Sequence, residues 1–571
     1  MVNLQQAISN KYPSIQKLPF PVKHTIFTFF KKLIYENEIN NFLQTNENLG
    51  AFDFIDAVLE YFNFSYKVLN NQIENIPSQG RVIIVANHPL GALDALSLVN
   101  LIKKVRSDVK IVANDFLTQI NQLQPILLGV DSFGASTSKQ MIKEIYESLD
   151  KEEVVIIFPS GEVSRARPAG IKDTTWHKGF LKFALKKNAP ILPVFIKAKN
   201  STFFYTISSI NKTLSTALLP YEMFNKKNKT LEFIVGEIIP FKSFNNDNLG
   251  IKTKVNLFKK HIYNISKNKK PIFQTQKCIA HPENRQEIKE ELQASTLLGS
   301  TTDGKKIYLF DFQIQSAVMR EISRLREFTF RKVDEGTGKK RDADEYDEYY
   351  QHIVLWDEDK LEIVGSYRIG NSDFINDCFG FDGFYSNTLF KFKPEFQKYL
   401  YNSIELGRSF VQPRYWGSRA LDYLWQGIGA YLYRNPHIRY IFGPVSLSSS
   451  VPKGAKNLIV YYYTKYYQSD EEFVDAIKPY EISQKDLKEL DAIFKGTNEK
   501  EDFLILKEYL EHYNTTVPIL YKQYTELCEQ GGTKFLGFNI DKEFNNCVDG
   551  FLVGDVNMFK EKKRKRYIKD S

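Results

Sequence analysis

A histidine and an aspartate follow a short apolar run in the sequence Asn87-His88-Pro-Leu-Gly-Ala-Leu-Asp94. The loop after a buried strand is a preferred place for an active site in α/β proteins. An imidazole beside a carboxylate can act as a general base, because the carboxylate sets the tautomer and stabilises the imidazolium that forms. We therefore predict that His88 is a catalytic base and that Asp94 orients it. The alternative is a histidine with a structural role in the core.

A second polar turn follows another apolar run, in Phe158-Pro159-Ser160-Gly161-Glu162-Val163-Ser164-Arg165. The proline and glycine shape a turn that presents backbone N–H groups together with a carboxylate, a hydroxyl and a guanidinium. Arginine suits the oxygens of an anionic head group or a carrier phosphate. The predicted substrate-binding residues of this half are Asn87, Pro159, Gly161, Glu162, Ser164 and Arg165. The alternative is an ordinary β–α turn with surface arginines.

The second half of the chain has its own polar series. It runs from Arg324-Leu-Arg326 through the acidic stretch Asp342–Asp347 and Arg368 to Glu405-Leu-Gly-Arg408-Ser-Phe-Val411. Glu405 is a candidate for a general base or an amino-acid ligand, and Arg408 is a candidate for binding a substrate carboxylate. The alternative for this pair, three residues apart, is a structural ion pair.

Alternating strands and helices must position these residues, which predicts an α/β protein of two domains. In the first half the expected strands are Val82–Ala86, Lys110–Ala113, Val154–Phe158, Ile191–Ile196 and Leu231–Val235, in a largely parallel sheet. The expected helices there are Leu93–Val105, Ser138–Ser148 and Gly179–Lys187. In the second half we expect strands at Gln351–Trp356, Glu362–Ile369 and Ser409–Val411, and helices at Ala317–Phe330 and Ser418–Arg434.

The pattern weakens after Ile251, and we place the domain boundaries there. We expect a first domain over residues 1–270, a linker over 271–300, a second domain over 301–558 and a basic tail over 559–571. Charge divides in the same way: residues 1–270 carry 35 Lys and Arg against 22 Asp and Glu, whereas the remainder carries 42 against 46. A basic first half is suited to an acidic partner or an anionic surface. The alternative is a solvated basic face.

Composition excludes several classes. With 43% hydrophobic and 25% charged residues, the chain is neither disordered nor collagen-like. The four cysteines have no CxxC spacing and no histidine partners, which indicates a reducing compartment and gives no support for a zinc site. The sequence has no apolar run of about 18 residues. Its first residues lack the apolar region of a secretory signal, so we expect no signal peptide. We therefore expect a cytoplasmic protein without a metal or redox cofactor.

The residues of the first half resemble the glycerolipid acyltransferases, typified by the lysophosphatidic acid acyltransferases. Asn87, His88 and Asp94 match their NHxxxxD motif with one extra residue, and Phe158-Pro-x-Gly161 matches their substrate motif. The extra residue and the glutamate after the glycine are typical of the subgroup that acylates ornithine lipids, as are Pro190-Ile-Leu-Pro193 and Asp173-xx-Trp176. The resemblance covers about residues 75–240 and implies a glycerolipid-acyltransferase-like αβ sandwich.

The second half resembles the GNAT-like N-acyltransferases that make lyso-ornithine lipid, and Glu405–Val411 carries most of that similarity. In GNAT folds the next loop binds the pyrophosphate of coenzyme A. Here Arg414-Tyr-Trp-Gly417-Ser-Arg419 keeps the arginine and the first glycine but has Arg419 in place of a small residue. Arg414 is therefore a candidate for binding the donor. The loop suits an acyl carrier protein, whose phosphopantetheine has one phosphate, although acyl-coenzyme A stays an alternative.

Together the two resemblances imply a fused, bifunctional ornithine-lipid synthase. The C-terminal half would transfer a 3-hydroxyacyl group from acyl carrier protein to the α-amine of an amino acid, with ornithine expected. The N-terminal half would then esterify that 3-hydroxyl. The alternatives are a glycine-lipid or other aminolipid synthase, a 1-acylglycerol-3-phosphate acyltransferase, and a non-enzymatic protein that binds membranes or nucleic acid through its tail.

The expected partners are acyl carrier protein, the amino acid and the inner face of the cytoplasmic membrane, and no nucleic acid. Peripheral attachment would use the basic tail and an amphipathic helix over Phe20–Ile34. The alternative for that helix is packing on its own domain.

Overall fold

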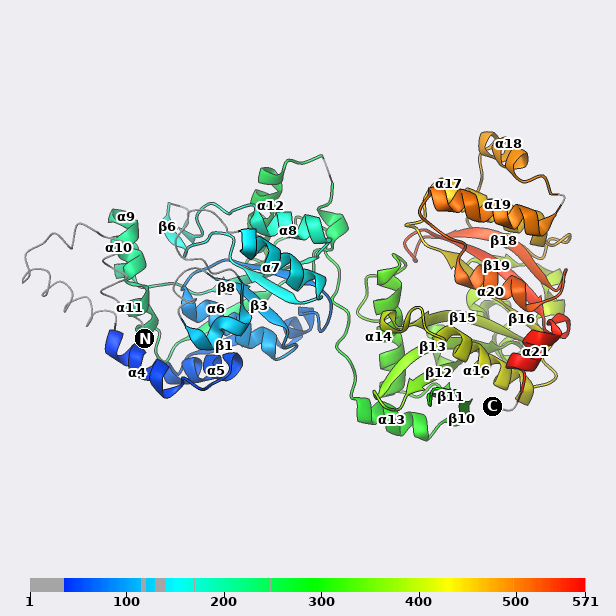
Figure 1. The fold of residues 1–571 in the computed structure, drawn as a ribbon, viewed down its shortest axis with the longest axis horizontal. Coiled ribbons are helices and arrows are strands. Elements are labelled where there is room, and N and C mark those ends of the chain that lie inside the picture. The colour runs from blue at the N-terminus through cyan, green and yellow to red at the C-terminus, as the bar shows by residue number, and fades with distance from the viewer. Residues whose placement is uncertain are drawn as a thin grey trace, which may run out of the picture. The chain divides into compact units, whose positions relative to one another are not determined.

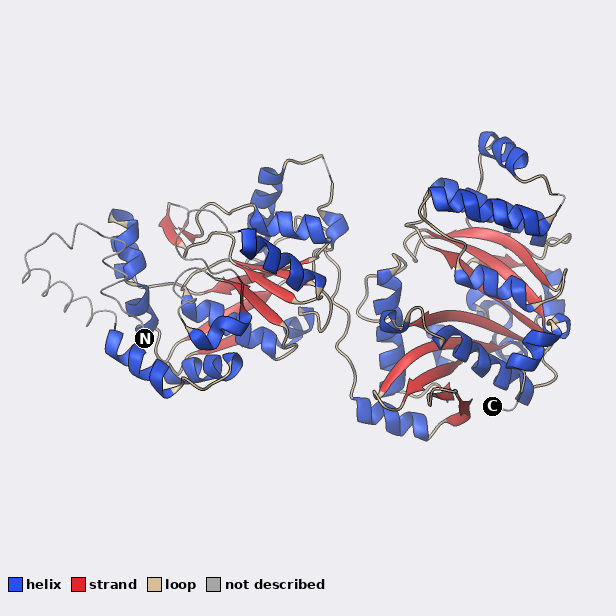
Figure 2. Ribbon diagram, in the orientation of Figure 1, coloured by secondary structure: helices blue, strands red, loops and turns tan. Residues whose placement is uncertain are grey.

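The computed structural model describes residues 35–113, 120–128, 139–168, 170–246, 248–496 and 498–569. The chain divides into two compact units, Met1–Cys278 and Ile279–Ser571, and each contains a sheet covered by helices (Figures 1 and 2). The expected helix Phe20–Ile34 lies outside the described residues. Within the described ranges, no helix combines the length and the apolar character that crossing a bilayer requires.

The first unit is built on a seven-stranded sheet of order β1-β9-β8-β2-β5-β3-β4. In chain order its strands are β1 Ser65–Val68, β2 Val82–Ala86, β3 Val109–Val112, β4 Leu127–Leu128, β5 Val154–Ile157, β8 Ile191–Lys197 and β9 Thr230–Val235. Every neighbouring pair is parallel except β8 and β9. The sheet is therefore of mixed orientation, with the largely parallel part around β2. A small hairpin, β6 Arg165–Arg167 and β7 Gly170–Lys172, stands apart from it.

Helices cover both faces of this sheet. They are α4 Glu36–Thr45, α5 Ala51–Tyr61, α6 Ala92–Lys103, α7 Lys139–Asp150, α8 Gly179–Lys187, α9 Thr202–Ile210, α10 Lys212–Ala217, α11 Leu219–Phe224 and α12 Ile251–Ile265. Ile84 of β2 packs in one core with α5 and α6, and Val85 packs in the other with α7, α8 and α12. A strand buried on both faces must be apolar throughout, which explains the continuous run Val82–Ala86.

The second unit has an eight-stranded sheet of order β10-β11-β12-β13-β15-β16-β19-β18. Its strands are β10 Thr296–Ser300, β11 Lys306–Asp311, β12 Gln351–Asp357, β13 Glu362–Asn371, β15 Ser403–Val411, β16 Tyr440–Leu447, β18 Thr533–Asp541 and β19 Cys547–Asp555. A separate pair is formed by β14 Phe390–Phe392 and β17 Val474–Ala476. One core packs the sheet against α16 Ala420–Arg434, α17 Lys453–Tyr467 and α20 Ile519–Leu527, and another packs it against α13 Arg285–Gln293 and α14 Ala317–Lys332. The remaining helices are α15 Ser372–Phe379, α18 Gln484–Ile493, α19 Glu499–His512 and α21 Glu561–Tyr567.

Strands β15 and β16 form the one parallel pair of this eight-stranded sheet as described. They pair over three residues, from Ser403 opposite Tyr440 to Glu405 opposite Phe442. Just beyond, a side chain at Gly443 would collide with the carbonyl oxygen of Leu406. The strands lose their pairing after this close approach. The register between β13 and β15 also shifts there, and Arg408 adopts a left-handed φ of 47°. A bulge of this kind re-aims a side chain beside a functional site.

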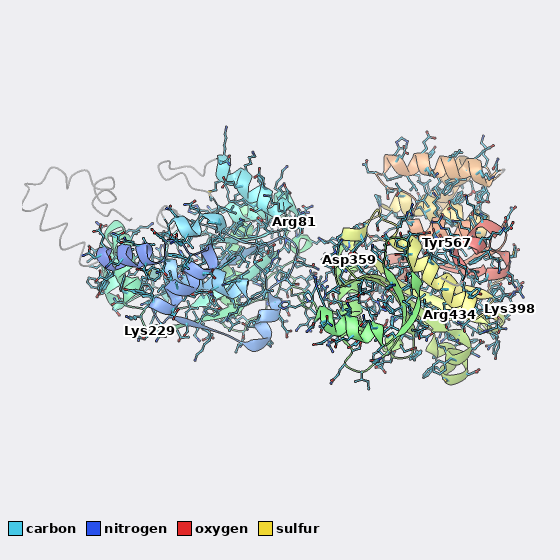
Figure 3. The ribbon with its side chains drawn as sticks, turned by 60° about the horizontal axis from the view of Figure 1, so that its bottom comes forward. Arg81, Lys229, Asp359, Lys398, Arg434 and Tyr567 are labelled. Carbon is cyan, nitrogen blue, oxygen red and sulfur yellow. The ribbon has the colours of Figure 1, made fainter. Side chains whose placement is uncertain are left out.

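Two regions differ from the expected boundaries. Residues 271–300 include α13 and β10, which pack in the second unit, because Leu292 and Leu298 are apolar and buried. The expected tail contains α21, which is held against α16 by Tyr567 (Figure 3). The Tyr567 side chain is buried, and its hydroxyl donates a 2.8 Å hydrogen bond to Asp422.

Candidate active sites

His88 lies at the end of β2 and is held there by its neighbours. The Asn87 amide bonds both backbone groups of Ile196 on β8, donating to its carbonyl at 3.0 Å and accepting from its N–H at 2.7 Å. After a turn at Gly91, which has a φ of 108°, α6 places Asp94 in its first turn. Asp94 accepts the Leu90 N–H at 2.7 Å, and its other oxygen lies 3.1 Å from His88 Nδ1. The structure thus brings the two predicted catalytic residues together.

The electrostatics of the pair suit a base. Burial lowers the pKa of His88, but the charges of Asp94 and Asp173 raise it, and the net effect is a pKa above the usual value. Asp94 is fully buried, while the His88 side chain is 14% exposed. Nδ1 faces the carboxylate, and Nε2 has no hydrogen-bond partner among the described residues. Nε2 is therefore available to accept a proton from a substrate hydroxyl.

Asp173 is a further member of the site that the site prediction left out. One of its oxygens accepts the His88 N–H at 3.2 Å and the Ser164 hydroxyl at 2.6 Å, and the other accepts the Trp176 indole N–H at 2.9 Å. Ser164 in turn donates its N–H to the His88 carbonyl at 2.7 Å. The predicted residue Ser164 and the histidine loop are thereby joined through one carboxylate. The signal for Asp173 was its spacing from Trp176, which sequence reasoning used only as a family marker.

The remaining residues of the Phe158–Arg165 turn either shape the turn or contact neighbouring side chains. The Phe158 ring stacks on His88 with centroids 4.2 Å apart, and the Pro159 carbonyl accepts the His177 N–H at 2.8 Å. Gly161 has a φ of 63°, a conformation that favours glycine in this turn. The Glu162 carboxylate accepts hydrogen bonds from Thr174 at 2.7 Å and Lys212 at 2.9 Å.

Arg165 is buried and bound to protein groups. Its guanidinium donates to the hydroxyls of Ser208, Ser215 and Thr216 at 2.8, 2.6 and 3.3 Å, and it lies 3.5 Å from Glu162. These contacts connect β6 to α9 and α10. Sequence reasoning offered Arg165 for a substrate anion, but the structure shows the side chain engaged with the protein.

In the second unit, Glu405 and Arg414 are also engaged. Glu405 is buried, its carboxylate accepts from Tyr350 and from the backbone and hydroxyl of Ser386, and burial raises its pKa. Arg414 pairs with Glu362 and is about half exposed. Neither residue lines the cavity described below.

Arg408 belongs to a buried network of three arginines and three aspartates. Its members are Arg326, Arg368, Arg408, Asp342, Asp344 and Asp347. Arg326 lies 2.7 Å and Arg368 3.1 Å from Asp347. Arg408 lies 3.2 Å from Asp344 and 3.7 Å from Asp342, so it pairs with the acidic stretch and not with Glu405. The alternative of a structural ion pair between Glu405 and Arg408 is therefore wrong, because the bulge separates the two side chains.

A cavity opens between β15 and β16 past the point where the strands stop pairing. Arg408 is the predicted site residue that reaches it. Its lining residues are Phe330, Glu335, Tyr367, Tyr385, Leu389, Leu406, Gly407, Arg408, Ser409, Pro444, Val445, Ser446, Leu520, Tyr524, Asp541, Phe544 and Asp549.

Comparison with known proteins finds a separate match for each of the two units. The Acyltransferase family model matches residues 7–270, and the Acetyltransferase (GNAT) domain model matches residues 325–426. Glycine N(alpha)-acyltransferase of Phocaeicola vulgatus is 32% identical over 303 residues, which cover 51% of this chain and 92% of that protein. Lyso-glycine lipid O-acyltransferase of the same organism is 28% identical over 226 residues, covering 38% and 80%. L-ornithine N(alpha)-acyltransferase of Brucella abortus is 32% identical over 122 residues, covering 20% and 41%.

The folds, the polar sites and these matches define an enzyme that joins an acyltransferase unit to a GNAT unit. The chain belongs to the aminolipid acyltransferase family and is a bifunctional O- and N-acyltransferase of aminolipid synthesis. The non-enzymatic alternative is wrong. The predicted roles of the individual site residues stay predictions.

Proposed function

We propose that this enzyme makes a glycine lipid in two steps. The GNAT unit joins a 3-hydroxyacyl group to the amine of glycine, and the acyltransferase unit then esterifies the 3-hydroxyl with a second acyl chain. In the second step His88 takes the proton of the hydroxyl as its oxygen attacks the thioester of the second acyl donor, and Asp94 stabilises the imidazolium. The C–O bond of the ester forms as the C–S bond breaks, and the imidazolium returns the proton to the thiolate, which leaves as a thiol. Because the product of the first step is the substrate of the second, fusion of the two units suits the chemistry.

The observation that carries the choice of glycine is the extent of the matches. Similarity to the glycine N-acyltransferase covers 92% of that protein, whereas similarity to the ornithine enzyme covers 41% of it. The first half of the chain also matches an enzyme named for lyso-glycine lipid. Glycine therefore replaces ornithine as the preferred amino acid of this proposal.

Acyl carrier protein is the proposed donor. The loop Arg414–Arg419 leads to the N-terminus of α16, where backbone N–H groups favour a phosphate. Arg414 is paired with Glu362, and Arg419 occupies the position of a second small residue. A loop with a paired arginine and a bulky Arg419 suits the single phosphate of phosphopantetheine better than the pyrophosphate of coenzyme A.

The head group is tested by expressing the intact chain in a bacterium that lacks aminolipids. We expect mass spectrometry to find a diacylated lipid with the head-group mass of glycine. When glycine and ornithine are offered at equal concentration, the purified enzyme should acylate glycine at least about tenfold faster. That ratio corresponds to about 1.4 kcal/mol of discrimination. A lipid with the mass of ornithine would overturn the head-group choice alone. Altered phosphatidic acid without an aminolipid would favour the 1-acylglycerol-3-phosphate alternative.

We also propose that the enzyme attaches to the inner face of the cytoplasmic membrane, with α21 in contact with anionic lipids. Lys562, Lys565, Arg566 and Lys569 are exposed on and just after this helix. Each cation near an anionic surface contributes roughly 1 kcal/mol. The enzyme should sediment with phosphatidylglycerol vesicles at low salt and much less with phosphatidylcholine vesicles. The double variant Lys562→Glu/Lys569→Glu should sediment less with the phosphatidylglycerol vesicles. Equal sedimentation with both lipids would contradict this attachment.

A further inference from the structure

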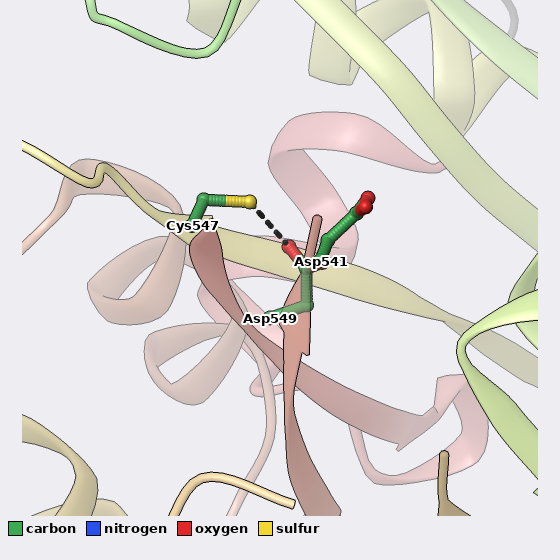
Figure 4. A group of neighbouring side chains, drawn as sticks. All are labelled: Asp541, Cys547 and Asp549. Atoms are coloured by element: carbon green, nitrogen blue, oxygen red, sulfur yellow. Dashed lines mark hydrogen bonds between the residues drawn. The ribbon is translucent and has the colours of Figure 1, made fainter. Parts of the chain in front are cut away.

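Three carboxyl groups line the cavity of the second unit, and nothing in the mechanism so far uses them. They belong to Glu335, after α14, to Asp541 at the end of β18 and to Asp549 on β19. Figure 4 shows Asp541 and Asp549 close together beside Cys547. One carboxylate oxygen of each aspartate and the Cys547 sulfur all lie within 4.8 Å of one another. Three acids around one cavity require a partner or a proton.

The protein supplies little positive charge to these acids. Among the described residues that line the cavity, Arg408 is the one cationic side chain, and it is already paired with Asp342 and Asp344. The Glu335 carboxylate accepts no hydrogen bond from any described residue. The cavity therefore has an excess of negative charge, and a cationic group of a ligand would be stabilised there.

Arg408 offers a place for an anionic group of the same ligand. The Arg408 side chain is nine-tenths buried, and its Nε atom has no hydrogen-bond partner within the described part of the chain. Its guanidinium lies over the rings of Tyr385 and Phe544, with 4.7 and 4.5 Å to the centroids. An unpartnered N–H beside a set of carboxylates matches a zwitterion, with the carboxylate at Arg408 and the ammonium at the acids.

Asp549 is the acid best placed to act on the amine. One Asp541 oxygen already accepts the backbone N–H groups of Glu543 and Phe544 at 2.8 and 3.2 Å, which fixes the turn after β18. Asp549 pairs in register with Ser446 of β16, whose hydroxyl donates to one carboxylate oxygen at 2.6 Å. The Cys547 thiol lies 3.6 Å from the same oxygen. The second oxygen of Asp549 has no partner among the described residues.

We infer that Asp549 receives the ammonium of the amino-acid acceptor and takes its proton, with Glu335 and Asp541 holding the charge and Arg408 holding the carboxylate. This inference rests on the proposed function, which makes a free amino acid the acceptor. The amine nitrogen forms the C–N bond as the thioester C–S bond breaks. Of the two protons that the ammonium loses, one goes to Asp549 and then to water, and the other goes to the departing thiolate, which leaves as a thiol.

The titration of the site agrees with this role. Burial raises the pKa of Asp549, the Ser446 hydroxyl opposes this shift and the charge of Asp541 adds to it, and the net result is a pKa of about 6. Burial and the charge of Asp549 raise the pKa of Glu335 to about 8. Asp549 is therefore mostly ionised at neutral pH and can accept a proton, whereas Glu335 is mostly protonated until the ammonium of the ligand enters and favours its ionised form. The titratable and charged groups facing it are Arg408, Asp541, Cys547, Glu335, Tyr385 and Tyr521.

The experiment measures N-acylation by the full chain with glycine and a 3-hydroxyacyl thioester of acyl carrier protein. We expect Asp549→Asn to lower kcat at least about 100-fold and to abolish the fall in rate below pH 6. Glu335→Gln should raise the KM for glycine several-fold and leave the KM for the thioester unchanged. The matched control is Asp555→Asn, the same substitution on the same strand outside the cavity, which should keep kcat within a few-fold.

The outcomes separate the inference from the proposed function. If the wild-type enzyme acylates neither glycine nor another amino acid, the proposed function fails. If the wild type acylates glycine and Asp549→Asn does so at the same rate with the same pH profile, this inference fails and the function stands. Equal losses in Asp549→Asn and Asp555→Asn, with matching drops in Tm, would show a structural role and overturn it. A wild-type rate that chelators abolish and added Zn²⁺ restores would overturn it in favour of a metal at the cluster.

Discussion

The His88→Ala enzyme is expected to lose at least about 100-fold of its O-acylation rate, because a positioned general base contributes about 10²–10⁴-fold. Its N-acylation should be unchanged, since the GNAT unit does not use His88. A host that expresses this variant should therefore accumulate the mono-N-acylated amino acid in place of the diacylated lipid. Mass spectrometry of the lipid extract measures both species, and the N-acylation product is an internal control for folded, active protein.

The pH dependence of the same step gives a sharper test of the histidine. A protonated imidazole accepts no proton, so O-acylation should fall as the pH falls below the raised pKa of His88. Asp94 raises that pKa from 3.1 Å away. In Asp94→Asn the acidic limb should move to lower pH while the maximal rate falls. An unmoved limb in Asp94→Asn, or a diacylated lipid from His88→Ala, would contradict the assignment of His88 as the base.

The Arg368→Met enzyme is expected to lose about 3–5 kcal/mol of stability in the second unit, because removing one partner of a buried ion pair leaves uncompensated charge. Arg368 is buried, pairs with Asp344 and Asp347, and lies over the Tyr350 ring at 5.1 Å. At roughly 2–4 °C per kcal/mol for a domain of this size, one calorimetric transition should fall by about 10 °C. N-acylation should be lost with it, since Asp344 also holds Arg408.

Arg439→Met is the matched control for Arg368. Arg439 is 54% exposed and pairs with Asp555 at 3.2 Å, and an exposed pair is worth about 0–1 kcal/mol. If Arg439→Met lowers Tm as much as Arg368→Met does, the buried network is not what stabilises the unit.

The stability difference between Arg368→Met and the wild type should also depend on pH. Burial alone would raise the pKa of Asp347, but Arg326 and Arg368 lower it well below its usual value, and Arg368 and Arg408 lower that of Asp344. A depressed carboxyl pKa stabilises the fold above the unfolded value of about 3.9 and less as the pH falls toward the folded value. The difference in Tm between the two enzymes should therefore be full at pH 7 and shrink below about pH 4.

Much of the fold followed from local sequence. The apolar runs at Val82–Ala86 and Val154–Phe158 correspond to strands β2 and β5, and Gly179–Lys187 corresponds to α8. The two strands were predictable because a strand covered by helices on both faces has no polar position. Boundaries were less predictable. The strand expected at Ser409–Val411 begins at Ser403, and its first half was missed because it contains Glu405, a buried carboxylate whose partners Tyr350 and Ser386 lie elsewhere in the chain.

For function, the sequence by itself determined the His88–Asp94 pair, since a strand end, a turn and a helix start bring residues so near in the chain together. The tertiary structure alone decided the rest. Arg165 is bound by hydroxyls of α9 and α10, Glu405 is enclosed by Ser386 and Tyr350, and Asp549 faces a cavity formed where β15 and β16 separate. Their partners lie tens to hundreds of residues away, and whether a charged side chain meets a substrate or another side chain depends on how distant strands and helices are arranged.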